Sequence, residues 1–164
     1  MPNWCSNSLT ITHEDSAKVD ALETELKKGD ESRVFNHIVP RPADQEENWY
    51  DWNINNWGCK WDTTPYSWER DGNTITMDFD TAWSPPTTLY ENMENDGWEV
   101  RALYHEPGMV FIGSYENGSD DYYEYDITDR ESIENLPEQL IDYGNLMEEH
   151  ENWIEENKDE TEVG

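Results

Sequence analysis

Three aspartates are placed where they could bind a divalent cation. Asp78 and Asp80 alternate along one expected strand and therefore share a face of it, and Asp62 precedes them in a segment that could fold back beside that strand. Carboxylate oxygens are the ligands that Mg²⁺ and Ca²⁺ prefer, so a small metal-dependent hydrolase is one interpretation. Acids that alternate on a polar strand face are usually only hydrated. We therefore favour a protein without a metal or any other cofactor.

The other residue types that commonly catalyse reactions form no recognisable motif. The spacings of the histidines and cysteines match neither a zinc site nor a catalytic triad: His13, His37, His105, His150, Cys5 and Cys59. Both cysteines lie among aromatic residues, where a small buried side chain is the commoner role. No glycine-rich loop that would bind phosphate is present. The sequence therefore predicts that the protein is not an enzyme.

Aromatic residues are concentrated in one segment, WNINNWGCKWDTTPYSW, which holds four tryptophans between residues 52 and 68. Two interpretations stay open for its centre and for a tryptophan further along the chain. In the favoured one, these rings pack under an irregular segment and hold it down. In the other, they form a partly exposed site for a peptide or small ligand, because Trp and Tyr dominate binding hot spots. The candidate residues are Trp57, Lys60, Trp61, Asp62 and Trp83.

Charge separates the end of the chain from the rest. The net charge is −29, and residues 116–164 alone hold 18 acidic and two basic residues. A nucleic-acid-binding protein normally presents a basic stripe to phosphates, and so acidic a surface would also be repelled by anionic lipids. We therefore expect neither nucleic acid nor a membrane as a direct partner. The start of the chain lacks the basic and apolar runs of a signal peptide, which favours the cytoplasm.

The acidic surface has two interpretations. It could serve only solubility, or it could bind a basic protein through steered, salt-sensitive association. A total of 29 charges corresponds to about 50 Å of duplex DNA, which makes DNA mimicry feasible. The partner would then be a nuclease, a restriction or repair enzyme, or a nucleoid protein. The carboxylates expected to contact it are Glu148, Glu149, Glu151, Glu155, Glu156, Asp120 and Asp121.

Hydrophobic periodicity predicts an α+β fold with two parts. Alternation indicates strands at 8–12, 74–80, 98–104, 109–115 and 122–127, and a shorter strand at 34–39. Helical spacing indicates helices at 16–28 and from Thr87, the latter with a Thr88…Glu91 capping pattern. We expect a domain at 1–128 with a long Trp-rich loop at about 40–68. An acidic helical extension at 129–164, with a frayed end, follows it.

The order strand, helix, two strands, helix, strand is that of a ferredoxin-like antiparallel sheet with two helices on one face. Three motifs accompany this order: MPNWCSN at the start, NWGCKWD from Asn56, and FDTAWSPP from Phe79. Together they resemble the YubB-type ferredoxin-like domain family of phage and plasmid proteins, over roughly residues 1–127. Cys59 departs from the pattern, which has a small hydroxyl residue there. The resemblance implies a fold and a mobile-element setting, and it implies no common activity.

These observations lead to one principal hypothesis and two alternatives. The principal hypothesis is an acidic phage or mobile-element accessory protein that binds and inhibits a basic, nucleic-acid-binding host protein, as in anti-defence or host takeover. The first alternative is a peptide- or ligand-binding module that uses the Trp57 to Asp62 segment, with an acidic surface that serves only solubility. The second is the metal-dependent enzyme. The oligomeric state stays open.

Overall fold

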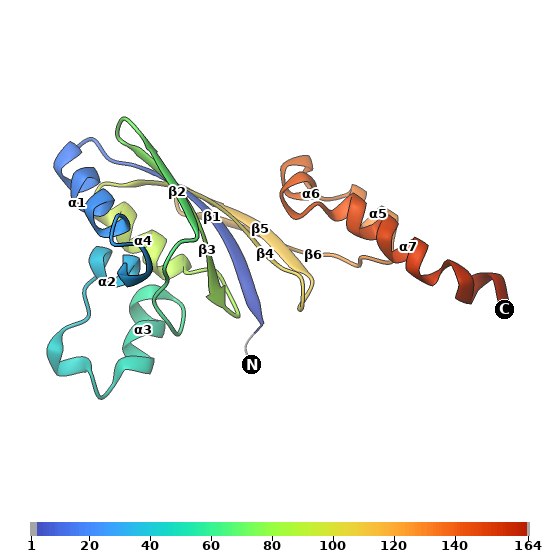
Figure 1. Ribbon diagram of the computed structural model, residues 1–164, viewed down its shortest axis with the longest axis horizontal. Coiled ribbons are helices and arrows are strands. Elements are labelled where there is room, and N and C mark those ends of the chain that lie inside the picture. The colour runs from blue at the N-terminus through green and yellow to red at the C-terminus, as the bar shows by residue number, and fades with distance from the viewer. Residues whose placement is uncertain (1–2, 164) are drawn as a thin grey trace.

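The computed structural model describes residues 3–163, with side chains as far as Lys158, and contains one six-stranded antiparallel sheet with helices on both faces (Figure 1). The strands follow the order β2-β3-β1-β4-β5-β6. Their bounds are β1 Trp4–Thr12, β2 Ser67–Asp71, β3 Thr74–Ala82, β4 Glu99–Glu106, β5 Phe111–Glu116 and β6 Ser119–Glu124. The helices are α1 Ser16–Leu26, α2 Val34–Ile38, α3 Trp49–Trp57, α4 Thr87–Asn95, α5 Arg130–Glu134, α6 Glu138–Gly144 and α7 Leu146–Val163. None of the helices in this described part of the chain is long and apolar enough to cross a bilayer.

One face of the sheet forms the main core with α1 to α4. Leu9 and Ile11 of β1 alternate with polar residues, and β3 contributes Met77 and Phe79 to the same face. These side chains pack against apolar residues of the four helices, such as Leu22 of α1. The α+β class predicted from the sequence is therefore confirmed.

The opposite face carries the C-terminal helices over β4 to β6 (Figure 1). Ile112 of β5 is fully buried in a second core with Ile133 of α5, Leu140 of α6 and Leu146 of α7. The extension therefore packs on the sheet, and removing it would expose this apolar surface. Beyond His150, α7 extends away from the sheet.

Most predicted elements are confirmed, with longer or shifted ends. These are the first strand, the helix from Ser16, the strand from Thr74, the helix from Thr87 and the last three strands. The tight turn between β5 and β6 is also confirmed, because Asn117 and Gly118 both have positive φ angles, of 50° and 84°. The helical extension is confirmed, and α7 is helical as far as Val163. Gly164, at the end predicted to fray, lies outside the described residues.

Two predictions about the middle of the chain are wrong. The segment 34–39 is the helix α2, and the second strand of the chain is instead β2 at Ser67–Asp71, which pairs with β3 at the edge of the sheet. The segment at about 40–68 is not one loop, because it contains α3, which ends at Gly58 in a left-handed conformation with φ 84°. The capping prediction is also wrong, since α4 begins after Pro86 without a side-chain cap.

Candidate functional site

Trp57, at the centre of the predicted aromatic site, is a core residue. Its side chain is 2% exposed and its indole N–H donates to the carbonyl of Val39 at 3.0 Å. The rings of Phe35 and Trp52 meet it edge to face, with centroids at 5.9 and 5.4 Å. The interpretation of these tryptophans as packing residues therefore applies to Trp57.

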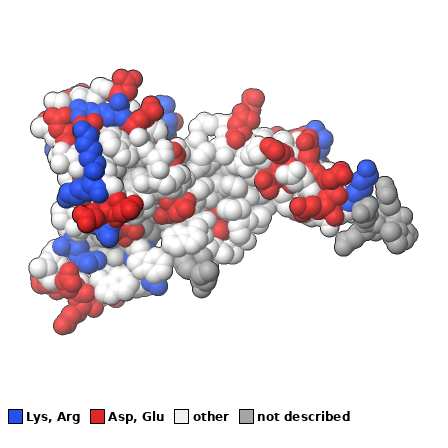
Figure 2. Space-filling view, in the orientation of Figure 1, with Lys and Arg blue, Asp and Glu red and all other residues white. Residues whose placement is uncertain are grey.

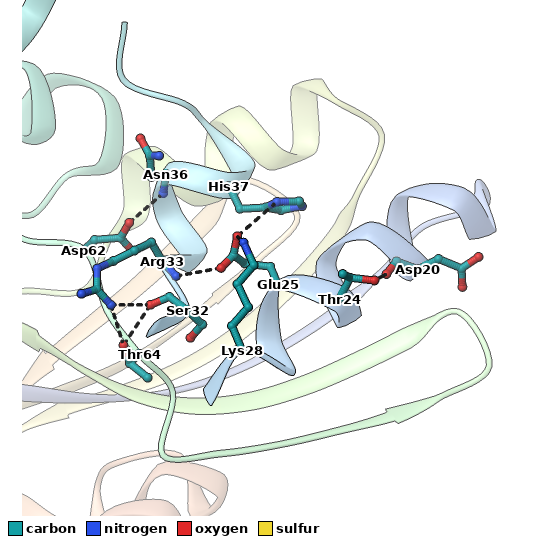
Figure 3. A network of polar contacts seen from close by, with 10 residues as sticks. All are labelled: Asp20, Thr24, Glu25, Lys28, Ser32, Arg33, Asn36, His37, Asp62 and Thr64. Carbon is teal, nitrogen blue, oxygen red and sulfur yellow. Dashed lines mark hydrogen bonds and ion pairs between the residues drawn. The ribbon is translucent and has the colours of Figure 1, made fainter. Parts of the chain in front are cut away.

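Asp62 joins two segments of the backbone. Its carboxylate accepts hydrogen bonds from two N–H groups in the first turn of α2, that of Phe35 at 2.8 Å and that of Asn36 at 2.9 Å. Figure 3 shows the bond to Asn36. It also accepts from the N–H of Thr63 at 2.7 Å. Burial raises the pKa of Asp62, and these hydrogen bonds oppose that shift. Asp62 is therefore engaged by the backbone that forms α2.

The candidate metal site is not formed. Within residues 3–158, no group of three or more His, Cys, Asp or Glu side chains lies close enough to hold a metal ion. Asp78 and Asp80 face away from the main core on β3, and burial alone raises the pKa of Asp80. Asp62 is turned toward α2 instead of toward them.

Lys60 and Trp61, in contrast, lie at the surface. The Lys60 ammonium is 4.4 Å from the centroid of the Trp61 ring, within the range of a cation–π contact. The Trp61 ring is 6.1 Å from that of Trp4, and both rings are exposed. The predicted site thus separates into a buried residue, Trp57, and a surface pair in which Lys60 is half-buried and Trp61 is exposed.

Trp83 lines a different surface, an open hollow of about 500 Å³ between the start of α4 and the strands β4 to β6. We call it the aromatic hollow and define it by Ile54, Trp83, Tyr104, Phe111, Asp120 and Tyr122. Trp83 is 52% exposed and Tyr122 is 51% exposed. The rings of Tyr122 and Phe111 are 5.2 Å apart, so one wall is a continuous aromatic surface.

The backbone of Trp83 has φ 72°, in the left-handed region that bulky residues rarely adopt. Its N–H donates to the carbonyl of Asn3 at 2.8 Å, and the N–H of Ser84 donates to the carbonyl of Ala82 at 2.9 Å. These hydrogen bonds hold a tight turn directly after β3. The turn directs a large aromatic ring toward solvent at a cost in backbone energy.

Asp120 is the acidic group of the hollow. Its Oδ1 accepts a hydrogen bond from the hydroxyl of Tyr104 at 2.6 Å. The Tyr104 ring reaches it by crossing Gly113 of β5, where an added Cβ would overlap the Tyr104 hydroxyl and lie 2.5 Å from the carbonyl oxygen of Asp121. Burial, followed by the bond to Asp120 and its charge, raises the pKa of Tyr104. Tyr104 therefore stays protonated as the donor.

The two predicted partner-binding residues of β6 lie on opposite faces of the sheet. Asp120 pairs with Tyr115 and shares its face with Tyr122, whereas Asp121 points to the other side. Only Asp120 lines the hollow.

The five glutamates of α7 are all exposed. They lie within the nine residues from Glu148 to Glu156, whose eight steps span about 12 Å along a helix axis. Over that length duplex DNA carries about seven charges and a single strand carries between three and four, so the charge density of this helix lies between those of duplex and single-stranded DNA. Among the side chains that the structure describes, none of the five forms an ion pair within 4 Å: Glu148, Glu149, Glu151, Glu155 and Glu156.

The charge distribution is uneven over the surface. Figure 2 shows Asp and Glu both over the C-terminal helices and over the opposite end, around α1 and its neighbours, where most of the Lys and Arg that it shows also lie. The bases there are largely neutralised locally. Arg70, for example, lies 2.7 Å from Asp20, and Lys18 lies 2.6 Å from Asp96.

The histidines and cysteines have structural contacts. His13 is hydrogen-bonded to the carbonyl of Asp96, and His150 to the carbonyl of Ile127. His105 is hydrogen-bonded to the hydroxyl of Tyr125. His37 lies 3.9 Å from the carboxylate of Glu25 (Figure 3). Both thiols are buried, and burial raises the pKa of Cys5 and of Cys59 to about 12. Thiols of this kind are poor nucleophiles at neutral pH.

Sequence reasoning missed Tyr104, Phe111 and Tyr122 as a group. Of the segment that it expected to meet Trp83, Gly58 lines the hollow, whereas Trp57, Lys60, Trp61 and Asp62 do not. One signal was available, because Gly113 interrupts an apolar strand, and such a glycine often marks the close approach of another group. The left-handed backbone of Trp83 has no sequence signal, since the residue types favoured there are Gly, Asn and Asp.

Comparisons with known proteins identify no family for this chain. No family model matches the chain, and no curated protein matches it significantly. It is similar to a solved structure of the protein api92 from Yersinia pseudotuberculosis, described under the family model DUF1281, with 25% identity and a TM-score of 0.41. The alignment covers 56% of this chain and 39% of that chain. The resemblance to the YubB-type family stays a prediction.

Proposed function

We propose that the protein captures a basic, nucleic-acid-binding protein of the host cell and inhibits it by occupying the groove that binds DNA. The observation that supports this most is the row of five exposed, ion-pair-free glutamates on α7, between Glu148 and Glu156, within the described side chains. Such a row attracts a basic groove over long distances and makes association sensitive to salt. The phage or plasmid setting implied by the sequence resemblance gives this activity a use against host defence.

The fold would act as the scaffold in this proposal. We infer that β1 to β4 with α1 and α4 form a ferredoxin-like unit, which the order β2-β3-β1-β4 and the packing of both helices on one face support. The second core anchors the base of α7 through Leu146 and His150, both buried. A helix anchored at one end can present its carboxylates without a large loss of conformational freedom on binding.

The experiment that tests the proposal is capture from a bacterial lysate by the immobilised full chain. The test variant replaces all five α7 glutamates by glutamine, which keeps the shape and removes five charges. Its matched control changes five exposed acids elsewhere that form no ion pair with any described side chain: Glu14→Gln, Glu31→Gln, Asp44→Asn, Glu47→Gln and Asp51→Asn. Both variants have the same net charge.

The proposal expects DNA-binding proteins to be retained by the wild type and the control and released by moderate salt. The α7 variant should retain them at least tenfold less well. Equal retention by both variants would show that the acidic surface acts only through net charge or solubility, and would refute a site on α7.

A further inference from the structure

The aromatic hollow has a composition that suits a cation. Aromatic faces carry negative electrostatic potential, and a cation within about 6 Å of a ring centroid is attracted to it. Trp83 and Tyr122 both line the hollow and both leave about half of their surface exposed. Each of them can therefore offer ring surface to a ligand.

Carboxylates add charge on the same side of the sheet. Asp120 and Glu124 lie two residues before and after Tyr122 on β6, so all three share one face. The Tyr122 hydroxyl donates a hydrogen bond to Glu124 at 3.1 Å, and the hydroxyl of Tyr104, on β4, donates one to Asp120. These two hydrogen bonds fix both acids beside the Tyr122 ring, and an anionic ligand would be repelled there.

The strained backbone at Trp83 also indicates a functional role for its ring. A large residue with φ 72° is strained, yet its ring is not needed to fill the core, because it is 52% exposed. Strain of this kind concentrates at sites that bind ligands.

From these contacts we infer that the aromatic hollow binds the guanidinium or ammonium group of one arginine or lysine, carried by an exposed segment of the partner protein. The cation would lie over the rings of Trp83 and Tyr122 and pair with Asp120. Its aliphatic stem would lie along Phe111 and Ile54. Charge complementarity selects this occupant over an apolar peptide, which would desolvate the charge of Asp120 with only the neutral Tyr104 hydroxyl to compensate it. The inference rests on the proposed function only for the identity of the partner.

The probe is a short peptide, acetyl-Gly-Ala-Arg-Ala-Gly-amide, compared with a twin in which citrulline replaces arginine. Citrulline has nearly the shape of arginine, but its urea group is neutral and carries an oxygen acceptor in place of one NH2 donor of the guanidinium. Binding to the full chain is followed by two-dimensional NMR, which measures weak affinities and reports the position of each shift. The arginine peptide should shift the Trp83 indole and the backbone amides of 120–124, and it should bind at least tenfold more tightly than its twin.

Two variants locate the site. Asp120→Asn keeps an oxygen that can accept from Tyr104 but removes the charge, and it should weaken the peptide about tenfold, the value of one charged contact of about 1.4 kcal/mol. Asp121→Asn makes the same change on the other face and should alter affinity less than twofold. Trp83→Gly, which suits the backbone there, should weaken binding several-fold while the fold is retained.

Three results would overturn the inference. They are equal affinity for the two peptides, equal effects of Asp120→Asn and Asp121→Asn, and shifts confined to α7 or to the Trp61 region. The test is separate from that of the proposed function, because the variant with five glutamines on α7 should still bind the peptide in the hollow. Loss of capture without loss of peptide binding, or the reverse, therefore identifies which proposal fails.

Discussion

The backbone at position 83 gives a prediction that reverses an ordinary rule of stability. We expect Trp83→Gly to be more stable than Trp83→Ala. In a strand or helix the opposite is normal, since glycine loses more conformational freedom than alanine on folding. Position 83 differs because its φ of 72° is strained for any residue with a Cβ.

The expected difference in the free energy of unfolding between the two variants follows from the backbone terms that remain after the ring is removed. Both variants lose the same ring contacts, so those contacts cancel when the two are compared. Alanine in the left-handed region costs about 1–2 kcal/mol, and the greater freedom of unfolded glycine offsets about 0.5–1 kcal/mol of that. The glycine variant should therefore unfold with a free energy about 0.5–1 kcal/mol larger, or at a Tm about 1–4 °C higher.

The assay is thermal and urea unfolding of both variants, with the same pair made at Trp4 as the control. Trp4 is as exposed as Trp83 but lies in β1, outside the left-handed region. There the alanine variant should be the more stable by about 0.5–1 kcal/mol. An advantage for alanine at position 83 of the same size as at position 4 would refute the assignment of strain.

Three further predictions concern buried groups. Asp62→Ala should lower the free energy of unfolding by about 2–4 kcal/mol, because three backbone N–H groups lose their acceptor; a loss below 0.5 kcal/mol in urea titrations would contradict this. In the folded protein, Cys5 and Cys59 should react very slowly with a disulfide reagent at pH 8, since burial raises the pKa of each thiol to about 12. After unfolding, the reagent should detect both thiols. Fast reaction of the folded protein would contradict their burial. Burial lowers the pKa of His105 in the folded protein, so as pH falls the His105 imidazole is protonated first in the unfolded chain. The stability that neutral His105 contributes is therefore present above the ordinary pKa of 6.5 and is lost as pH falls through the lowered pKa. The wild type should therefore lose more stability than His105→Gln between pH 7 and 5, and parallel curves would count against this.

The elements of the fold that follow simple patterns could be predicted from the sequence. β1 and β3 alternate cleanly because one face is buried, and α1 is followed directly by two lysines and a glycine, residue types typical of a helix end. The edge strand β2 could not, because SWERD contains three charged residues and its side chains are exposed or half-buried. Edge strands need little apolar surface, so their periodicity is weak.

The candidate site was predictable only in part, for a related reason. The charge of α7 is a property of composition and can be counted. The aromatic hollow depends on the register that places Tyr104, Gly113 and Tyr122 in one row across three strands, and on the turn at Trp83. Such proximity between residues far apart in the sequence is set by tertiary pairing. The prediction of a strand at 34–39 fails for the same reason, because the carboxylate that accepts from the first turn of α2 belongs to Asp62, far along the chain.

Competition with DNA tests the central claim most directly. A DNA-binding protein that the wild type captures is mixed with a fluorescent duplex at moderate salt, and increasing amounts of each variant are added. The account predicts that the wild type and the control with five neutral residues elsewhere displace the duplex. The variant with glutamine at Glu148, Glu149, Glu151, Glu155 and Glu156 should need at least ten times more protein. Displacement by all three at the same concentration, or a ternary complex that keeps its DNA, would contradict the claim.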